Sequence, residues 1–238
     1  MGKLEKQSAS PPPGQIRHDS HTIDTLNVSS YDTHGTPSTA DDEMFFGDGN
    51  LPTNYNISVD AKTHIELGVK IHYRQGNDIT PTSVDPDGTA HYQVPAGTQV
   101  IDPAHGVSSA NPARAAWNFD FSVNTGLDGS TKTLDNFDFR IIVTSGDGET
   151  GTFDLNHLGP GNTPWGTLAG GFADEDGSNP QLSQNSVNLG FNFMTAIFGP
   201  DALNAGEQYD ITLQAFDHTN GNGNGNIVAQ VHDHLILV

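Results

Sequence analysis

The sequence contains no cysteine and only 9 lysine and arginine residues. Without cysteine, the fold cannot depend on disulfides and no thiol is available as a nucleophile. Set against 29 acidic residues, so few basic residues argue against nucleic acid and anionic membranes as partners, because both attract clustered positive charge. Apolar runs are also short, and none approaches the roughly 20 residues that cross a bilayer. We therefore expect no nucleic-acid partner and no membrane span.

Length and composition indicate one β-rich domain preceded by a tail. A chain of 238 residues is long enough to bury a core without disulfides. Apolar residues make up only 34% of it, and it holds 27 glycines and 14 prolines, a combination typical of short strands joined by polar loops. Residues 1–22, which include a proline-rich run, are predicted to form a flexible tail, and residues 23–238 a single domain.

Apolar and polar side chains alternate along most of this domain. The pattern predicts strands at 23–30, 55–60, 64–74, 117–125, 137–144, 209–215 and 227–238. Every second side chain from Tyr55 onward, Ile57 included, is expected to point into one shared interior. In the segment 64–74, Lys70 and His72 fall on the opposite, polar face, so the strands are interpreted as half-buried.

Half-buried strands of this kind are typical of antiparallel sheets. The segments between them are rich in Gly, Pro, Asn and Asp, which favours a sandwich over a parallel α/β sheet. We predict an all-β antiparallel sandwich of the jelly-roll or immunoglobulin-like kind, with long Asp- and Gly-rich loops. At most one short helix is expected, near residues 193–198.

Aspartate beside glycine recurs in the loops and points to a hard cation. Only 6 of the 29 acidic residues are Glu, and Asp-Gly steps occur at 48, 87, 128, 147 and 176. Calcium takes six to eight oxygen ligands, so turns rich in Asp and Asn can supply much of its shell. The candidate calcium ligands are Asp85, Asp87, Asp147, Glu149, Asp174, Asp176 and Asn179.

The same loops have a second interpretation, as plain hairpin turns. Gly reaches positive φ at low cost and Asp bonds its own backbone, so Asp-Gly steps form tight turns without any metal. None of the loops follows the EF-hand pattern, since the loop at 174 has Gly in fourth place and no Glu in twelfth. Calcium binding and solvated turns both stay open.

Two histidines near the C-terminus suggest a transition-metal site. Residues two apart on a strand share a face, so His232 and His234 could present two imidazoles to one zinc or copper ion while Asp233 points away. A third ligand would have to come from another strand, because zinc sites use three or four ligands. The alternative is a polar face of a terminal strand.

Signals for catalysis are few. The sequence has no Gly-x-Ser-x-Gly elbow, and no acidic pair at strand spacing stands beside aromatic residues, as a glycoside hydrolase would need. We interpret the protein as more consistent with a non-enzyme. A carbohydrate-binding or carbohydrate-cleaving jelly-roll is the alternative, in which Trp165, on a loop, would stack on a sugar unless it caps the core.

The last third of the chain resembles a known class of protein. SQNSVNLGFNF at 183–193, FGPDALNAGEQYDITLQAF at 198–216 and VAQVHDHLILV at 228–238 are similar to the closing part of β-sandwich domains in secreted bacterial surface proteins, particularly those sorted by exosortase-type systems. GEQYDITLQAFD at 206–217 also looks like the penultimate strand of immunoglobulin-like extracellular modules. The basic sorting tail of that group is not in this sequence.

The resemblance implies an extracellular or cell-surface protein with an immunoglobulin-like fold. Together with the acidic loops, it favours a non-catalytic sandwich with a structural, matrix or adhesive role, stabilised by calcium. Exposed sheet edges can pair between molecules, so self-association is one expected partner mode, and a glycan or matrix polymer is another.

Overall fold

The structure is a computed structural model that describes residues 16–18, 55–60, 62–125, 130–154, 182–217 and 225–238. The predicted strand at 23–30, the acidic loop at 174–179 and Trp165 lie outside these residues. Within the predicted tail, Ile16–His18 form strand β1, which pairs antiparallel with β2 (Asn56–Asp60).

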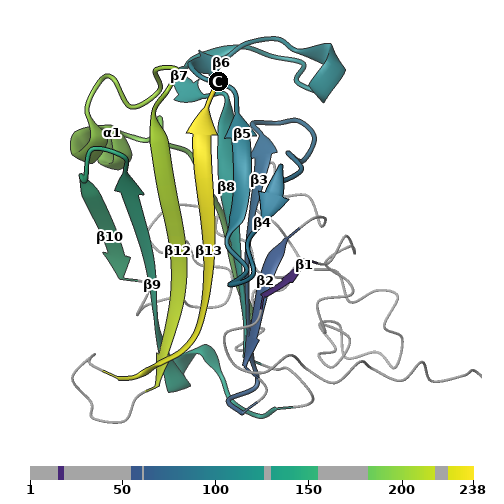
Figure 1. Cartoon of the computed structure of the whole chain (residues 1–238), viewed down its shortest axis with the longest axis vertical. Coiled ribbons are helices and arrows are strands. Elements are labelled where there is room, and N and C mark those ends of the chain that lie inside the picture. The colour runs from purple at the N-terminus through teal and green to yellow at the C-terminus, as the bar shows by residue number, and fades with distance from the viewer. Residues whose placement is uncertain (1–15, 19–54, 61, 126–129, 155–181, 218–224) are drawn as a thin grey trace, which may run out of the picture.

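Two large sheets lie face to face and form a sandwich (Figure 1), so the predicted all-β fold is confirmed. The five-stranded sheet has the order β1, β2, β3 (Ile65–Tyr73), β8 (Trp117–Asn124), β11 (Leu182–Val187). The six-stranded sheet has the order β10 (Thr150–Asp154), β9 (Phe137–Ser145), β12 (Gln208–Asp217), β13 (Ile227–Leu237), β5 (Ala90–Val94), β4 (Ser83–Val84).

Shorter elements lie at the ends of the sandwich. A small sheet pairs β6 (Thr98–Gln99) with β7 (Asn111–Ala115), and single 3-10 turns cover Pro103–His105 and Leu134–Asn136. Helix α1 (Asn192–Phe198) occupies the segment where a short helix was predicted and packs near β10. Neighbouring strands in the two large sheets run antiparallel, apart from β13 and β5, which run parallel.

The core lies between the two sheets and follows the predicted alternation. From the five-stranded sheet, β3 and β8 contribute every second side chain; from the six-stranded sheet, β9, β12 and β13 do the same. Registers pair buried residues across neighbours, as in the row Ile141, Leu213, Val231. Burying a large aliphatic or aromatic side chain contributes about 1.5–3 kcal/mol, so these faces supply the main driving force for the fold.

Strand β2 faces the other way from the prediction. Its register places Asn56 opposite Val69 and Ser58 opposite Leu67, so the polar side chains of β2 point toward the second sheet. Ile57 lies opposite Gly68 on the outer face. The predicted alternation is present, but the predicted face is wrong. The apolar side chains of β2 are buried on the outer face of the sheet and not between the two sheets.

Strands β3 and β8 are buried on both faces, which corrects the expectation of half-buried strands. Lys70 and His72, on the outer face of β3, are fully buried, and so is Asp120 on β8. Every residue of β8 is buried. A strand enclosed on both sides normally reads as continuously apolar, so the polar residues here require partners.

Gly68 is explained by the inverted orientation of β2. The Tyr55 ring lies over it on the outer face, and a Cβ at position 68 would stand 2.8 Å from Tyr55 Cδ1. Real Cβ atoms do not approach so closely, so the ring or the strand would have to move. Glycine therefore provides the space that the buried ring occupies.

We expect Gly68→Ala to lower the free energy of unfolding by about 1–3 kcal/mol, the usual cost of overpacking. Urea unfolding followed by tryptophan fluorescence measures the change. Gly146→Ala is the matched control, because its added Cβ would meet Gln208 Cβ at 3.3 Å on an exposed turn. Equal stability of wild type and Gly68→Ala would show that Tyr55 does not pack on this face.

Candidate functional site

The acidic hairpin between β4 and β5 closes on itself. The Gly88 amide donates to the Asp85 carbonyl (2.8 Å) and the Asp85 amide donates to the Thr89 carbonyl (2.9 Å). The Asp87 carboxylate accepts the Thr89 amide at 3.0 Å, and this hydrogen bond holds the pKa of Asp87 below its ordinary value. The Asp87 carboxylate thus serves the turn that contains it.

The hairpin between β9 and β10 uses the same device. The Gly148 amide donates to the Ser145 carbonyl (2.9 Å), and the Ser145 hydroxyl donates to the Asp147 carboxylate. That hydroxyl lowers the pKa of Asp147. Gly88 and Gly148 both have positive φ, which explains the glycine in each Asp-Gly step.

Calcium ligation by Asp85, Asp87, Asp147 and Glu149 remains a prediction. Within the parts of the chain that the structure covers, no group of three or more His, Asp or Glu side chains is arranged to hold one metal ion. The remaining candidates, Asp174, Asp176 and Asn179, and the proposed sugar platform Trp165, lie outside the described residues.

His232 and His234 lie on the outer face of the six-stranded sheet, and Asp233 points inward between them, as strand geometry predicts. Asp210 on β12 pairs in register with His234. His234 Nδ1 lies 2.7 Å from Asp210 Oδ1, and His232 Nε2 lies 3.4 Å from the same oxygen. One carboxylate therefore links the two imidazoles.

A third imidazole comes from the neighbouring strand. His91 on β5 is the register partner of His234, and the two rings lie with centroids 5.3 Å apart at an angle of 58°. On its other side, His91 Nε2 lies 2.9 Å from Asp85 Oδ2. We call Asp85, His91, His234, Asp210 and His232 the histidine row.

Sequence reasoning named His232, His234 and Asp85 but not Asp210 or His91. Asp210 sits at an alternate, outward position of a strand that was predicted, so its side of the sheet could be read from the sequence. Its neighbours could not, because only the strand order and register place it beside His234. The parallel pairing of β5 with β13 had no sequence signal.

A second charged cluster, buried on the outer face of the five-stranded sheet, joins β3 to β8 and to the loop after β3. Lys70 Nζ lies 3.3 Å from Asp78 Oδ1 and 3.6 Å from Asp120 Oδ2. His72 Nε2 lies 2.9 Å from Asp120 Oδ1, and His72 Nδ1 lies 2.8 Å from the Tyr73 carbonyl. Both ring nitrogens face acceptors, an arrangement that a protonated imidazole satisfies by donating from each.

This buried cluster sets two basic side chains, Lys70 and His72, against two carboxylates, Asp78 and Asp120. Burial raises the pKa of Asp78, although Lys70 pulls it back toward the ionised form. Removing one partner from such a set leaves an uncompensated buried charge, so the cluster holds β3, β8 and the residue 78 segment together.

Asp233 occupies the interior of the sandwich. Its Oδ1 accepts a hydrogen bond from the Asn56 side-chain amide at 2.7 Å, whereas the described residues supply no hydrogen-bond partner to its Oδ2 or to Asn56 Oδ1. Burial raises the pKa of Asp233 well above the ordinary carboxyl value, and the Asn56 hydrogen bond offsets this only in part. Asn56 also donates to the His232 carbonyl (3.2 Å), so it ties β2 to β13 across the core.

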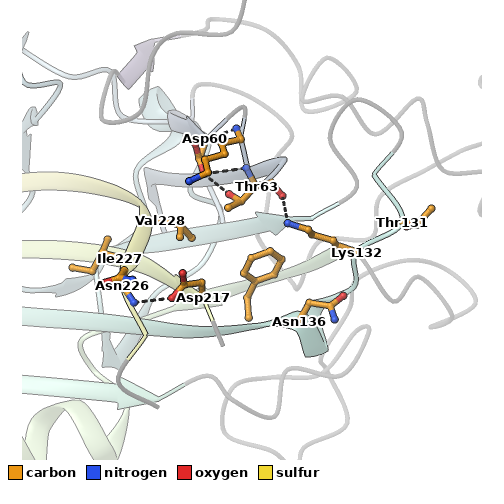
Figure 2. Close-up of a pocket in the computed structure, with 11 residues that line it drawn as sticks. Asp60, Thr63, Thr131, Lys132, Asn136, Asp217, Asn226, Ile227 and Val228 are labelled. Atoms are coloured by element: carbon orange, nitrogen blue, oxygen red, sulfur yellow. Dashed lines mark hydrogen bonds between the residues drawn. The ribbon is translucent and has the colours of Figure 1, made fainter. Parts of the chain in front are cut away.

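An open cavity of about 660 Å³ lies at one end of the sandwich, between the end of β2, residues 131–137, the last residue of β12 and the start of β13 (Figure 2). Its polar side chains bond locally: Asp60 accepts from the Lys62 and Thr63 amides, and Asp217 accepts from the Asn226 amide. Phe137 is the aromatic residue in its lining, and its ring is buried, so it offers no exposed face for a sugar.

Compared with known proteins, the chain matches no family model and no curated protein. Among the residues that the structure describes, no helix is long and apolar enough to cross a membrane. Unlike the buried Lys70 cluster and the two acidic hairpins, the histidine row brings titratable side chains from neighbouring strands together at the surface of a sheet.

We expect Asp233→Asn to stabilise the protein at neutral pH by about 1–3 kcal/mol, the cost of a buried polar group without a partner. A raised pKa means that the folded chain holds the proton more tightly than the unfolded chain. The group therefore stabilises the fold at acid pH and loses that contribution as pH rises. An amide has no charge to bury, and its Nδ2 could donate to Asn56 Oδ1.

Urea unfolding from pH 4 to pH 8 measures this effect. The advantage of Asp233→Asn over wild type should grow with pH, whereas Asp135→Asn, at an exposed position, should show no such trend. A variant less stable than wild type throughout would show that the interior uses the ionised carboxylate.

Proposed function

We propose that this chain is a non-catalytic β-sandwich module of an extracellular or cell-surface protein, with a structural, matrix or adhesive role. The observation that carries the proposal is the use of charged side chains inside the described sandwich. Lys70 and His72 pair with Asp78 and Asp120 in a buried cluster, and Asp87 and Asp147 close their own turns. These particular acidic and basic side chains are thus committed to holding the fold.

The surface supports the same role. A net charge of −20 favours solubility and cation binding, and repels anionic polymers such as nucleic acid. The segment that resembles immunoglobulin-like surface modules forms β12, and β13 is the next strand that the structure describes. β12 and β13 are long paired strands at the centre of the six-stranded sheet, which suits the rigid framework of a structural module.

Self-association through sheet edges belongs to this proposal. β4 and β10 are the outermost strands of the six-stranded sheet, and β1 and β11 those of the five-stranded sheet. Outer strands present backbone groups to which a neighbouring molecule can add a strand. A glycan or matrix polymer is the second proposed partner class, and neither class requires a catalytic centre.

The location and role can be tested in cells that produce the chain. We expect surface biotinylation and protease shaving to reach it in intact cells, while a cytosolic marker stays protected. Deleting its gene should reduce cell adhesion or retention of matrix, and the full chain should restore it. Protein found wholly in the cytosolic fraction would contradict the proposal.

We further propose that calcium stabilises the sandwich through its acidic loops. A ligand that binds only the folded chain raises the free energy of unfolding by RT ln(1 + [L]/Kd) and therefore raises the melting temperature. Calcium should therefore raise the melting temperature and chelator should lower it. Asp147 already accepts a hydroxyl within its turn, so the paired substitution Asp174→Asn with Asp176→Asn should abolish more of the effect than Asp147→Asn. Identical melting temperatures in calcium and chelator would exclude calcium.

A further inference from the structure

We propose that the histidine row binds a divalent transition-metal ion of the zinc–copper class, with His91 and His234 as its two protein ligands. The inference concerns the outer face of the six-stranded sheet and does not depend on the structural role proposed above. It uses side chains from β5 and β13, which lie side by side and run parallel.

The spacing of the two rings fits one ion. Zinc lies about 2.0–2.1 Å from a ligating imidazole nitrogen, so two imidazoles at a tetrahedral angle have ring centroids roughly 5 Å apart. The centroids of His91 and His234 lie 5.3 Å apart with the ring planes tilted by 58°. The backbone pairing of the two strands thus sets the separation that a shared ion needs.

Each ring also has the partner that metal-binding histidines use. A ligating imidazole usually holds its second nitrogen against a carboxylate, which fixes the ring and raises its basicity. His91 Nε2 lies 2.9 Å from Asp85 Oδ2, leaving Nδ1 for a metal, and His234 Nδ1 lies 2.7 Å from Asp210 Oδ1, leaving Nε2. The two carboxylates lie on either side of the pair of rings.

The site is open. Both rings are partly exposed, at 32% for His91 and 22% for His234, so an ion can reach them from solvent. No third protein ligand converges with them among the described residues, so a bound ion would keep water in its remaining positions and would be held more weakly than zinc in a site with three or four protein ligands. Soft or borderline ions that favour imidazole suit this arrangement, whereas calcium, which takes six to eight oxygen ligands, does not.

Isothermal titration of zinc into the untagged full chain tests the proposal. We expect His91→Ala and His234→Ala each to weaken the tightest zinc event at least tenfold. Asp210→Asn should weaken it about 10–100-fold, the usual effect of losing the carboxylate behind a ligand. The melting temperature of each variant without metal shows whether its fold is retained.

His105→Ala is the matched control. His105 Nδ1 lies 2.6 Å from Asp102 Oδ2, so it forms the same histidine–carboxylate pair, but its ring stacks on Tyr73 instead of lying beside an imidazole. Its loss should leave the tightest zinc event unchanged. Equal weakening in His105→Ala, or unchanged binding in both His91→Ala and His234→Ala, would overturn the proposal.

A second readout separates the row from other histidines. Copper(II) bound to the chain should show nitrogen hyperfine splitting from two imidazoles in electron paramagnetic resonance, reduced to one in His234→Ala. A spectrum that does not change in this variant would place the copper elsewhere and contradict the proposal.

Discussion

The face-to-face packing of two sheets with period-two apolar patterns is the constraint on which the rest of the structure depends. Because side chains alternate, a shift of one residue in any strand would exchange its inner and outer faces. The register that buries Leu213 beside Val231 therefore also decides which residues meet on the opposite surface. It puts His234 between Asp210 and His91 on the face of the sheet opposite the core. The core thus determines the chemistry of the surface.

The sequence was sufficient to predict the long strands whose apolar side chains face the core. The pattern in β3, β8, β9, β12 and β13 gave both their positions and their inner faces, because burial of large apolar side chains dominates there. Other strands were missed: β4 has two residues, too few for a period to be read, and β10, although as long as β2, contains a single large apolar side chain, Phe153. The β5–β13 pairing depends on strand order, which a pattern within one strand does not contain.

Strand β2 shows why the choice of face escaped prediction. Its apolar side chains are buried, as expected, but on the outer side of the five-stranded sheet, where Tyr55 lies over Gly68. The rule that apolar residues face the core assumes that a sheet has one buried face. Here both faces are buried, so hydrophobicity alone cannot select between them. The inner face of β2 makes a polar contact instead, since the Asn56 side-chain amide donates to Asp233 across the interior.

The buried charges on the outer face of the five-stranded sheet are paired across separate segments of the chain. Enclosing Lys70, whose side chain has no exposed surface, would cost several kcal/mol if it were alone. Asp78 and Asp120 on two separate segments face it, so the desolvation cost is offset only when the chain is correctly folded. Such a cluster adds less to net stability than an apolar core would, but alternative registers would leave its charges buried without partners. We infer that the cluster selects the correct pairing of β3 with β8 more than it adds to the stability of that pairing.

The aspartates at the two described acidic hairpins and beside the histidine row are of two kinds. Asp87 and Asp147 accept hydrogen bonds from their own turns, so backbone geometry accounts for the two Asp-Gly steps that the structure describes, at 87 and 147. Asp85 and Asp210 face imidazoles on neighbouring strands instead. Asp85 belongs to the same hairpin as Asp87, but its backbone rather than its side chain closes the turn, which frees the carboxylate for His91. Aspartate in the described hairpins therefore serves the backbone of its turn, whereas Asp85 and Asp210, beside His91 and His234, mark the surface at which a metal ion would be held.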